Sequence, residues 1–96
     1  MGTAPKLSID GMYNLAIEAY KHCKQKRDDY TIDDVYRFDN GMVPQIHLPG
    51  GTWLIKYDTG WSVEGTYSDL SRRMLWYIMK LSKEWIDNEL WYIMNL

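Results

Sequence analysis

The sequence predicts a single α+β domain. We expect an N-terminal helix, a short second helix, a three-stranded antiparallel meander, and a long aromatic C-terminal helix packed on one sheet face. Apolar residues recur at helical spacing near both ends of the chain, whereas the pattern between residues 42 and 67 has a period of two. The 96 residues are 46% hydrophobic and 25% charged, which suits one small core. We assign residues 1–7 to a flexible arm and residues 8–96 to the domain.

The first helix is expected over residues 8–27. Ser8 is suited to cap it, because a serine side chain accepts hydrogen bonds from the amides of the first helical turn. Asp10 near the start and Lys24, Lys26 and Arg27 near the end agree with the helix dipole. The apolar residues of the expected helix recur at intervals of three or four, which marks one stripe: Ile9, Met12, Tyr13, Ala16, Ile17, Tyr20 and Cys23.

The segment after Thr31 has two interpretations. Thr31 is a suitable cap for a short helix that would end at Asn40-Gly41. A strand that begins at Val35 is the alternative. If that strand turned back at Asn40-Gly41, Val35 would lie opposite Ile46 and Pro44 would fall in a central strand, where proline is rarely tolerated. We therefore favour the short helix.

Three strands are expected next, over residues 42–48, 52–58 and 61–67. A type II turn at Pro49-Gly50 would place Ile46 opposite Trp53. A bulged three-residue loop ending at Gly60 would place Ile55 opposite Val63. These pairings give one apolar sheet face toward the helices, formed by Ile46, Trp53, Ile55, Tyr57, Trp61 and Val63.

The C-terminal helix is expected to begin after Ser68, and its sequence contains a repeat. The pentapeptide Leu-Trp-Tyr-Ile-Met occurs at residues 75–79 and again at residues 90–94. Fifteen residues rotate a helix by about 60° beyond whole turns, so the second copy does not continue the face of the first. The second copy either folds back on the core, contacts another protein chain, or frays. For the second of these alternatives we expect an interface, with self-association, at Trp76, Leu90, Trp91 and Met94.

The sequence lacks the residue patterns of an enzyme. His22 and the lone Cys23 are adjacent, so on a helix their side chains diverge by about 100° and do not form a metal pair on their own. His47 is the other histidine, and nothing in the sequence brings it to Cys23. Gly50-Gly51 lacks the lysine of a phosphate-binding loop. We expect a buried cysteine, surface histidine, no catalytic residues, no metal and no cofactor.

The charge balance favours a protein partner. The formal net charge of −2 argues against general affinity for nucleic acid, and no apolar run is long enough to span a membrane. The single cysteine and the lack of a signal segment indicate the cytoplasm. We expect a non-catalytic protein-binding module, similar in size and composition to small inhibitors and immunity proteins of phages and mobile elements. An acidic surface that could face a basic partner is expected at Asp28, Asp29, Asp33 and Asp34.

A nucleic-acid-binding domain is the alternative. The order helix, three strands, helix resembles the topology of the double-stranded RNA-binding domain, and that resemblance implies contact with an RNA duplex. The family has a lysine-rich start to its last helix, where this chain has Ser-Asp-Leu-Ser-Arg-Arg at residues 68–73. The contact residues would form a basic strip on the C-terminal helix: Arg72, Arg73, Lys80 and Lys83.

Overall fold

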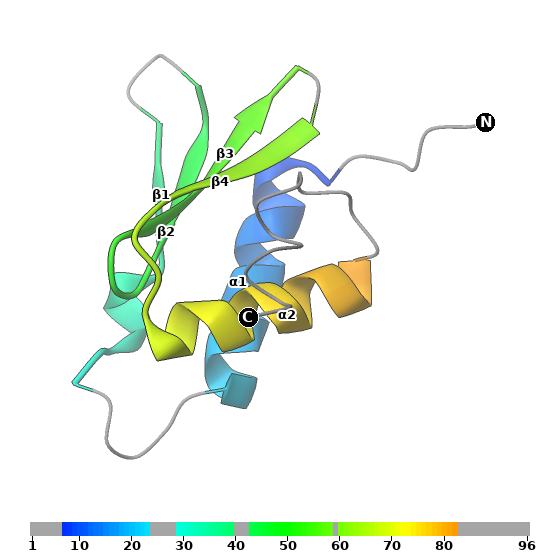
Figure 1. Ribbon diagram of the computed structural model, residues 1–96. Coiled ribbons are helices and arrows are strands. Elements are labelled where there is room, and N and C mark those ends of the chain that lie inside the picture. Colours follow the sequence, from blue (N-terminus) through cyan, green and yellow to red (C-terminus); the bar gives the residue numbers. More distant parts are fainter. Residues whose placement is uncertain (1–6, 24–28, 40–42, 59, 83–96) are drawn as a thin grey trace.

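The computed structural model describes residues 7–23, 29–39, 43–58 and 60–82. The α+β class is confirmed, but the sheet has four strands instead of three, in the antiparallel order β1-β2-β3-β4. Figure 1 shows the two helices crossing beside the sheet. The elements are α1 (Ile9–Cys23), the 3₁₀ turn η1 (Ile32–Asp34), β1 (Tyr36–Phe38), β2 (Gln45–Leu48), β3 (Thr52–Tyr57), β4 (Gly60–Gly65) and α2 (Asp69–Ser82).

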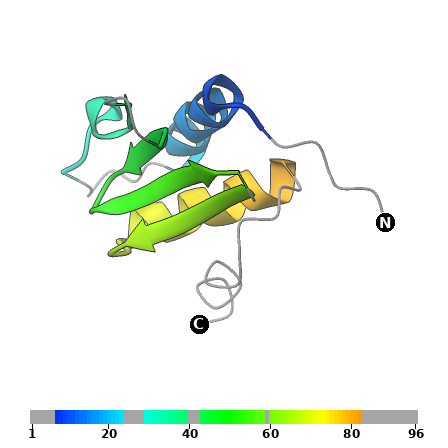
Figure 2. The same cartoon turned by 90° about the horizontal axis from the view of Figure 1, so that it is seen from above.

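The core lies between the helices and one face of the sheet (Figure 2). Each large apolar side chain buried there contributes about 1.5–3 kcal/mol relative to exposure. The buried cluster joins all the main elements: Met12, Ala16, Ala19 and Tyr20 of α1; Ile46, Leu48, Leu54, Trp61 and Val63 of the sheet; and Leu70, Met74, Leu75 and Ile78 of α2.

Both helices begin where the capping residues predict. Ser8 Oγ accepts a hydrogen bond from the Gly11 amide at 3.0 Å, and Ser68 Oγ accepts one from the Ser71 amide at 3.0 Å. Leu7, the last residue of the expected arm, packs against the core, and its carbonyl accepts a hydrogen bond from Trp61 Nε1 at 3.0 Å. Residues 24–27 of the predicted first helix lie outside the described residues.

The first copy of the repeated pentapeptide lies in α2. Leu75 and Ile78 are buried in the core, while Trp76 points outward. This arrangement agrees with one apolar stripe on the helix. The second copy, residues 90–94, lies outside the described residues. The alternatives of fold-back, interface and frayed end concern this same segment and stay predictions.

The prediction of a short second helix that ends at Asn40-Gly41 is wrong. Thr31 does cap a helical turn: its Oγ1 accepts from the Asp33 amide at 3.3 Å, and Asp34 Oδ2 accepts from the Thr31 amide at 2.7 Å. The turn, however, ends at Asp34, and the chain then enters strand β1. The preference for a helix was wrong because the return to β2 is longer than a two-residue turn. Phe38 pairs with Gln45, so Pro44 lies beyond the last pair and interrupts no strand.

Both predicted strand registers are wrong by one residue. The connection from β2 to β3 contains Pro49, Gly50 and Gly51, because the two glycines adopt φ values of +89° and +86°. Ile46 therefore pairs with Leu54 instead of Trp53. At the other end of β3, Tyr57 pairs with Gly60, which sets Leu54 opposite Val63.

This slip reverses the two sides of β3, because alternate strand residues point to opposite faces. Leu54 faces the helices together with Ile46, Trp61 and Val63. The prediction was correct for Ile46, Trp61 and Val63 and did not include Leu54. Trp53, Ile55 and Tyr57 alternate with Leu54 and lie on the other face, contrary to the prediction, although Ile55 is buried there.

A small polar network ties β3 to the start of α2. Thr52 and Ser71 are both fully buried, and their hydroxyl oxygens lie 2.8 Å apart. Thr52 also bonds the carbonyl of Thr66, and Ser71 Oγ accepts from the Ser68 amide at 2.9 Å. These bonds satisfy buried polar groups and fix the first turn of α2 against the sheet.

Candidate functional site

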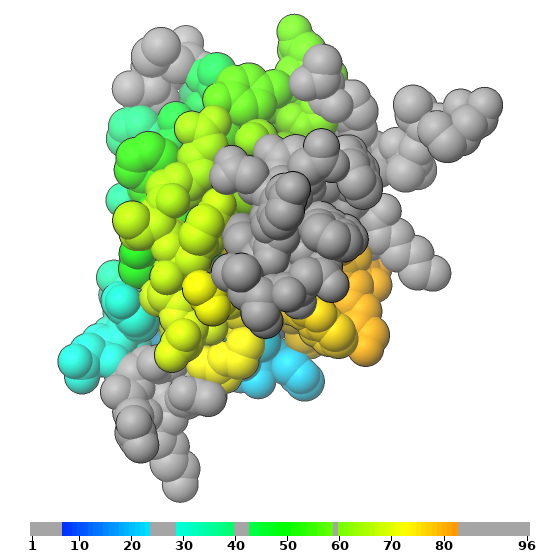
Figure 3. Space-filling view, viewed as in Figure 1, coloured from blue at the N-terminus to red at the C-terminus, as the bar shows by residue number. Residues whose placement is uncertain are grey.

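The outer sheet face, which lies opposite the helices, carries the candidate site. Its rings come from three strands, and four of them are well exposed: Tyr36 by 45%, Phe38 by 40%, Trp53 by 39% and Tyr57 by 40%. His47 lies among them and is half-buried. We call these five residues the aromatic face. Figure 3 shows β3 and β4, in green to yellow-green, at the molecular surface beside α2.

The strand register arranges part of the aromatic face as a row. Tyr36 pairs with His47, His47 with Trp53, and Trp53 with Glu64, so the row crosses all four strands. The ring centroids of Tyr36 and His47 are 4.8 Å apart, and those of His47 and Trp53 are 5.3 Å apart with planes at 26°. Phe38 lies 5.5 Å from His47. The rings of Tyr36, Phe38, His47 and Trp53 therefore form one continuous surface.

His47 is held at the centre of this surface by two hydrogen bonds. Its Nδ1 lies 3.0 Å from the Tyr36 hydroxyl, and its Nε2 lies 3.0 Å from Gln45 Oε1. A neutral ring protonated on Nε2 satisfies both contacts, because it donates to Gln45 and accepts from Tyr36. Burial lowers the pKa of His47 below its ordinary value, which favours the same neutral form.

A pocket of about 210 Å³ lies beside the row, next to the turn at residues 49–51. Tyr36, His47 and Trp53 line it, together with Leu48 and the residues of the turn. Asp34 is the acidic residue of the lining. Asp34 Oδ2 accepts from the Thr31 amide, so the capping box of η1 fixes the position of this carboxylate.

The positive charges of the described residues lie away from the aromatic face. Lys21 is on α1, while Arg72, Arg73 and Lys80 are on α2. The remaining two lie on the helix-facing side of their strands: Arg37 pairs in register with Ile46 and forms an ion pair with Asp10 of α1, and Lys56 pairs with Trp61.

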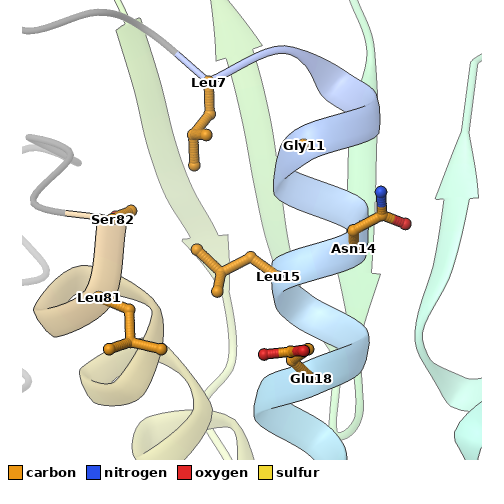
Figure 4. A pocket seen from close by; sticks show the side chains of 7 residues that line it. All are labelled: Leu7, Gly11, Asn14, Leu15, Glu18, Leu81 and Ser82. Carbon is orange, nitrogen blue, oxygen red and sulfur yellow. The ribbon is translucent and has the colours of Figure 1, made fainter.

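A second hollow lies between α1 and α2 (Figure 4). It has a volume of about 500 Å³. Leu15 and Glu18 line it from α1, Leu81 and Ser82 from the end of α2, and Leu7 from the segment before α1. Leu7 and Ser82 are the first and last described residues of the chain.

Of the interface residues predicted from sequence, only Trp76 can be placed. It is 44% exposed on α2, and Lys80 Nζ lies 4.4 Å from the centroid of its ring. Leu90, Trp91 and Met94 lie outside the described residues. The structure thus shows one exposed aromatic side chain of that predicted interface.

The predicted acidic surface is partly described. Asp29 and Asp33 are exposed, Asp34 is half-buried at the pocket, and Asp28 lies outside the described residues. Asp34 therefore belongs to the candidate site because it lines the same pocket as Tyr36, His47 and Trp53, and not because of the other acids.

The described residues of the predicted basic strip make different contacts. Arg72 is exposed, but Arg73 turns toward α1 and donates from Nη1 to the Cys23 carbonyl at 2.9 Å. Lys80 lies over Trp76. Lys83 lies outside the described residues.

The residues considered for catalysis or metal binding are not assembled. Cys23 Sγ donates to the Arg73 carbonyl at 3.6 Å, and burial raises the pKa of the thiol, against a smaller lowering by Arg73. His22 packs on Tyr77, and His47 lies on the sheet face opposite the helices. Within the described ranges, no three His, Cys, Asp or Glu side chains are placed to bind a metal ion. No helix in these same ranges is long and apolar enough to cross a membrane.

Comparisons of the chain with protein-family models, with curated proteins and with solved structures found no significant match. Function is therefore inferred from the aromatic face. Sequence reasoning missed this face because it placed Trp53 and Tyr57 in the core. The available signal was the extra glycine at Gly50-Gly51, which lengthens the turn and reverses β3.

Proposed function

We propose that the protein is a non-catalytic protein-binding module and that the aromatic face is its contact surface. The observation that carries this proposal is the continuous row of rings across β1, β2 and β3, in which Tyr36 and Trp53 are exposed. Clustered exposed aromatic residues are typical of binding surfaces, and tryptophan and tyrosine are the residues most often found at their energetic centres. Trp53 and Tyr36 are therefore the expected anchors.

The geometry of the face also supports tight binding. Tyr36 is held by His47, and His47 is held by Gln45 and by stacking on Trp53. Side chains that already occupy fixed positions lose little conformational entropy when a partner binds. More of the free energy gained by burying the rings then remains as affinity.

The proposal includes the kind of action. A chain of 96 residues with a net charge of −2 and a ring-covered sheet face is suited to occupy a partner's surface, as a small inhibitor or immunity-type protein of a phage or mobile element would. A cytoplasmic location and self-association through the C-terminal segment belong to the same proposal. The exposed side chain of Trp76 supports the proposed self-association.

The test compares one double replacement on the aromatic face with one single replacement on α2. A partner captured by the wild-type protein from the source organism is purified, and its affinity is measured by calorimetry. Tyr36→Ser with Trp53→Ser should weaken binding at least 100-fold, since each lost anchor costs about 2 kcal/mol or more. Leu81→Ser removes an exposed apolar side chain from α2 and should change affinity less than about threefold. Equal affinity of all variants would reject the aromatic face as the contact surface.

A second candidate function is binding of single-stranded nucleic acid. Exposed rings on a sheet face can stack on bases, which is the observation in its favour. Such sites also need cations along the backbone, and the described cations lie on the helices or on the helix-facing side of the sheet. Fluorescence anisotropy at low salt with labelled single-stranded RNA, single-stranded DNA and duplexes distinguishes the two functions. Duplex binding that weakens on Arg72→Glu would instead support the basic strip.

A further inference from the structure

We infer that the pocket beside the turn at residues 49–51 recognises a cationic side chain, a lysine or arginine carried by the protein partner. This inference rests on the proposed protein-binding function and specifies the chemistry of the partner. The residues that line the pocket include the aromatic residues Tyr36, His47 and Trp53 and the acidic residue Asp34.

The rings supply the first attraction. The face of an aromatic ring carries partial negative charge, and a cation within about 6 Å of its centroid is stabilised, most strongly by tryptophan. Tyr36, His47 and Trp53 are neighbours in one row, with centroid separations of 4.8 and 5.3 Å, so a group in the pocket meets several rings together.

Asp34 supplies the second attraction. Its position is fixed by the capping box, where Oδ2 accepts from the Thr31 amide at 2.7 Å. Among the residues that line the pocket there is no lysine or arginine. His47 does not oppose a bound cation near neutral pH, because its buried ring favours the neutral form and both ring nitrogens have partners.

The charges around the pocket also favour a cationic partner. Glu64 ends the row of rings on β4, and Asp34 lies at the β1 end, so carboxylates flank the row on both sides. The lysines and arginines of the described ranges lie on the helices or on the helix-facing side of the sheet. A phosphate backbone would be repelled by this arrangement, whereas a basic protein segment complements it.

The size of the pocket fits one side chain. Its volume of about 210 Å³ is below the roughly 300–1,000 Å³ typical of sites for drug-sized ligands. The pocket is therefore suited to the end of a lysine or arginine side chain whose main chain runs across the open sheet surface.

The experiment compares two probes of nearly equal shape. Nα-acetyl-arginine methylamide is a cation, and Nα-acetyl-citrulline methylamide is its neutral counterpart. Titrations of the ¹⁵N-labelled full chain, followed by two-dimensional NMR, should shift the signals of Trp53 and His47 with the arginine probe and leave them unchanged with the citrulline probe. Equal shifts with both probes would overturn the inference, and so would the absence of shifts with the arginine probe.

A pair of isosteric variants completes the test. Asp34→Asn keeps an oxygen that can accept from the Thr31 amide but removes the charge, and it should weaken the arginine probe at least fivefold. Asp33→Asn removes the same charge one residue away, outside the pocket lining, and should change binding less than twofold. Equal effects of the two variants would show a general electrostatic attraction and contradict a specific site.

The two proposals can fail separately. If the captured partner is lost on Trp53→Ser but binds Asp34→Asn at full affinity, the aromatic face stands and the cation site falls. If neither replacement alters partner affinity, the protein-binding role of this face falls, even where the arginine probe shifts Trp53.

Discussion

Arg73 and Cys23 join the two helices by a pair of hydrogen bonds. Arg73 Nη1 donates to the Cys23 carbonyl at 2.9 Å, and Cys23 Sγ donates to the Arg73 carbonyl at 3.6 Å. Cys23 is the last residue of α1 as the structure describes it, and its carbonyl accepts from the guanidinium. The guanidinium therefore places a positive charge near the carbonyl end of α1, where the helix dipole favours a cation. A side chain of α2 thus stabilises this part of α1.

Arg73→Ala should lower the free energy of unfolding by about 1.5–3 kcal/mol, because it removes a charge-assisted hydrogen bond and leaves the Cys23 carbonyl without that donor. Urea denaturation followed by circular dichroism measures the change. The neighbouring Arg72→Ala is the control, because Arg72 is exposed, and its effect should stay within about 0.5 kcal/mol. Equal losses for the two variants would contradict the helix-joining role.

The thiol of Cys23 should react slowly in the folded protein. Burial raises its pKa, which reduces the fraction of thiolate near neutral pH, and the thiolate is the reactive species. Reaction with Ellman's reagent at pH 7.5 should be at least about 10-fold slower than for the same chain in urea. The rate should increase with pH as the thiolate forms. A native rate equal to the unfolded rate would show that the thiol is not shielded.

Ser71→Ala should destabilise the protein by about 1–3 kcal/mol, although it removes a single oxygen atom. The change takes the acceptor from the Ser68 amide and a partner from buried Thr52. Asn14→Ala changes an exposed residue of α1 and serves as the comparison in thermal and urea denaturation. A stability of Ser71→Ala within about 0.5 kcal/mol of the wild type would mean that the hydroxyl network contributes little.

The stability contributed by a neutral His47 should decrease in acid. The ordinary pKa is 6.5, which applies to the unfolded chain, and the folded value is lower because of burial. Between these two pKa values the unfolded chain binds a proton that the folded chain does not. Stability therefore falls as pH decreases through this interval and levels off below the folded pKa.

His47→Gln removes the titrating ring and isolates this effect. The wild-type protein should lose more stability than His47→Gln between pH 7.5 and pH 5.5, as measured by urea denaturation at each pH. Parallel pH profiles for the two proteins would contradict the prediction. The groups that face His47 are the Tyr36 hydroxyl, Gln45, Phe38 and Trp53, with Asp34 in the shared pocket.

The helices could be predicted from the sequence because their signals agree. The caps at Ser8 and Ser68 agree with the observed starts of α1 and α2, the apolar stripe of α1 agrees with its buried side, and each signal is local. Strand β1 could not be predicted in the same way, since its only support is pairing with β2 after a six-residue connection. Its length of three residues is too short to show a period.

The aromatic face could not be predicted because the hydrophobic pattern of β3 favours the wrong side. Trp53, Ile55 and Tyr57 are the more hydrophobic set, yet the alternate set that faces the helices contains Leu54 as its one apolar residue. The choice depends on non-local pairing, which follows from the residue count of the turns. Asp34 was selected as part of an acidic cluster, but its position beside Trp53 also required the correct register.

The turn at Pro49, Gly50 and Gly51 has a consequence for how this protein can vary between species. Most surface turns gain or lose a residue with little effect. Loss of one glycine here would shift β3 against β2 by one position and exchange its two sides. Trp53 would enter the core and Leu54 would leave it. Such a chain would keep an apolar interior but present a different outer surface, so relatives that share the binding partner should also share the length of this turn.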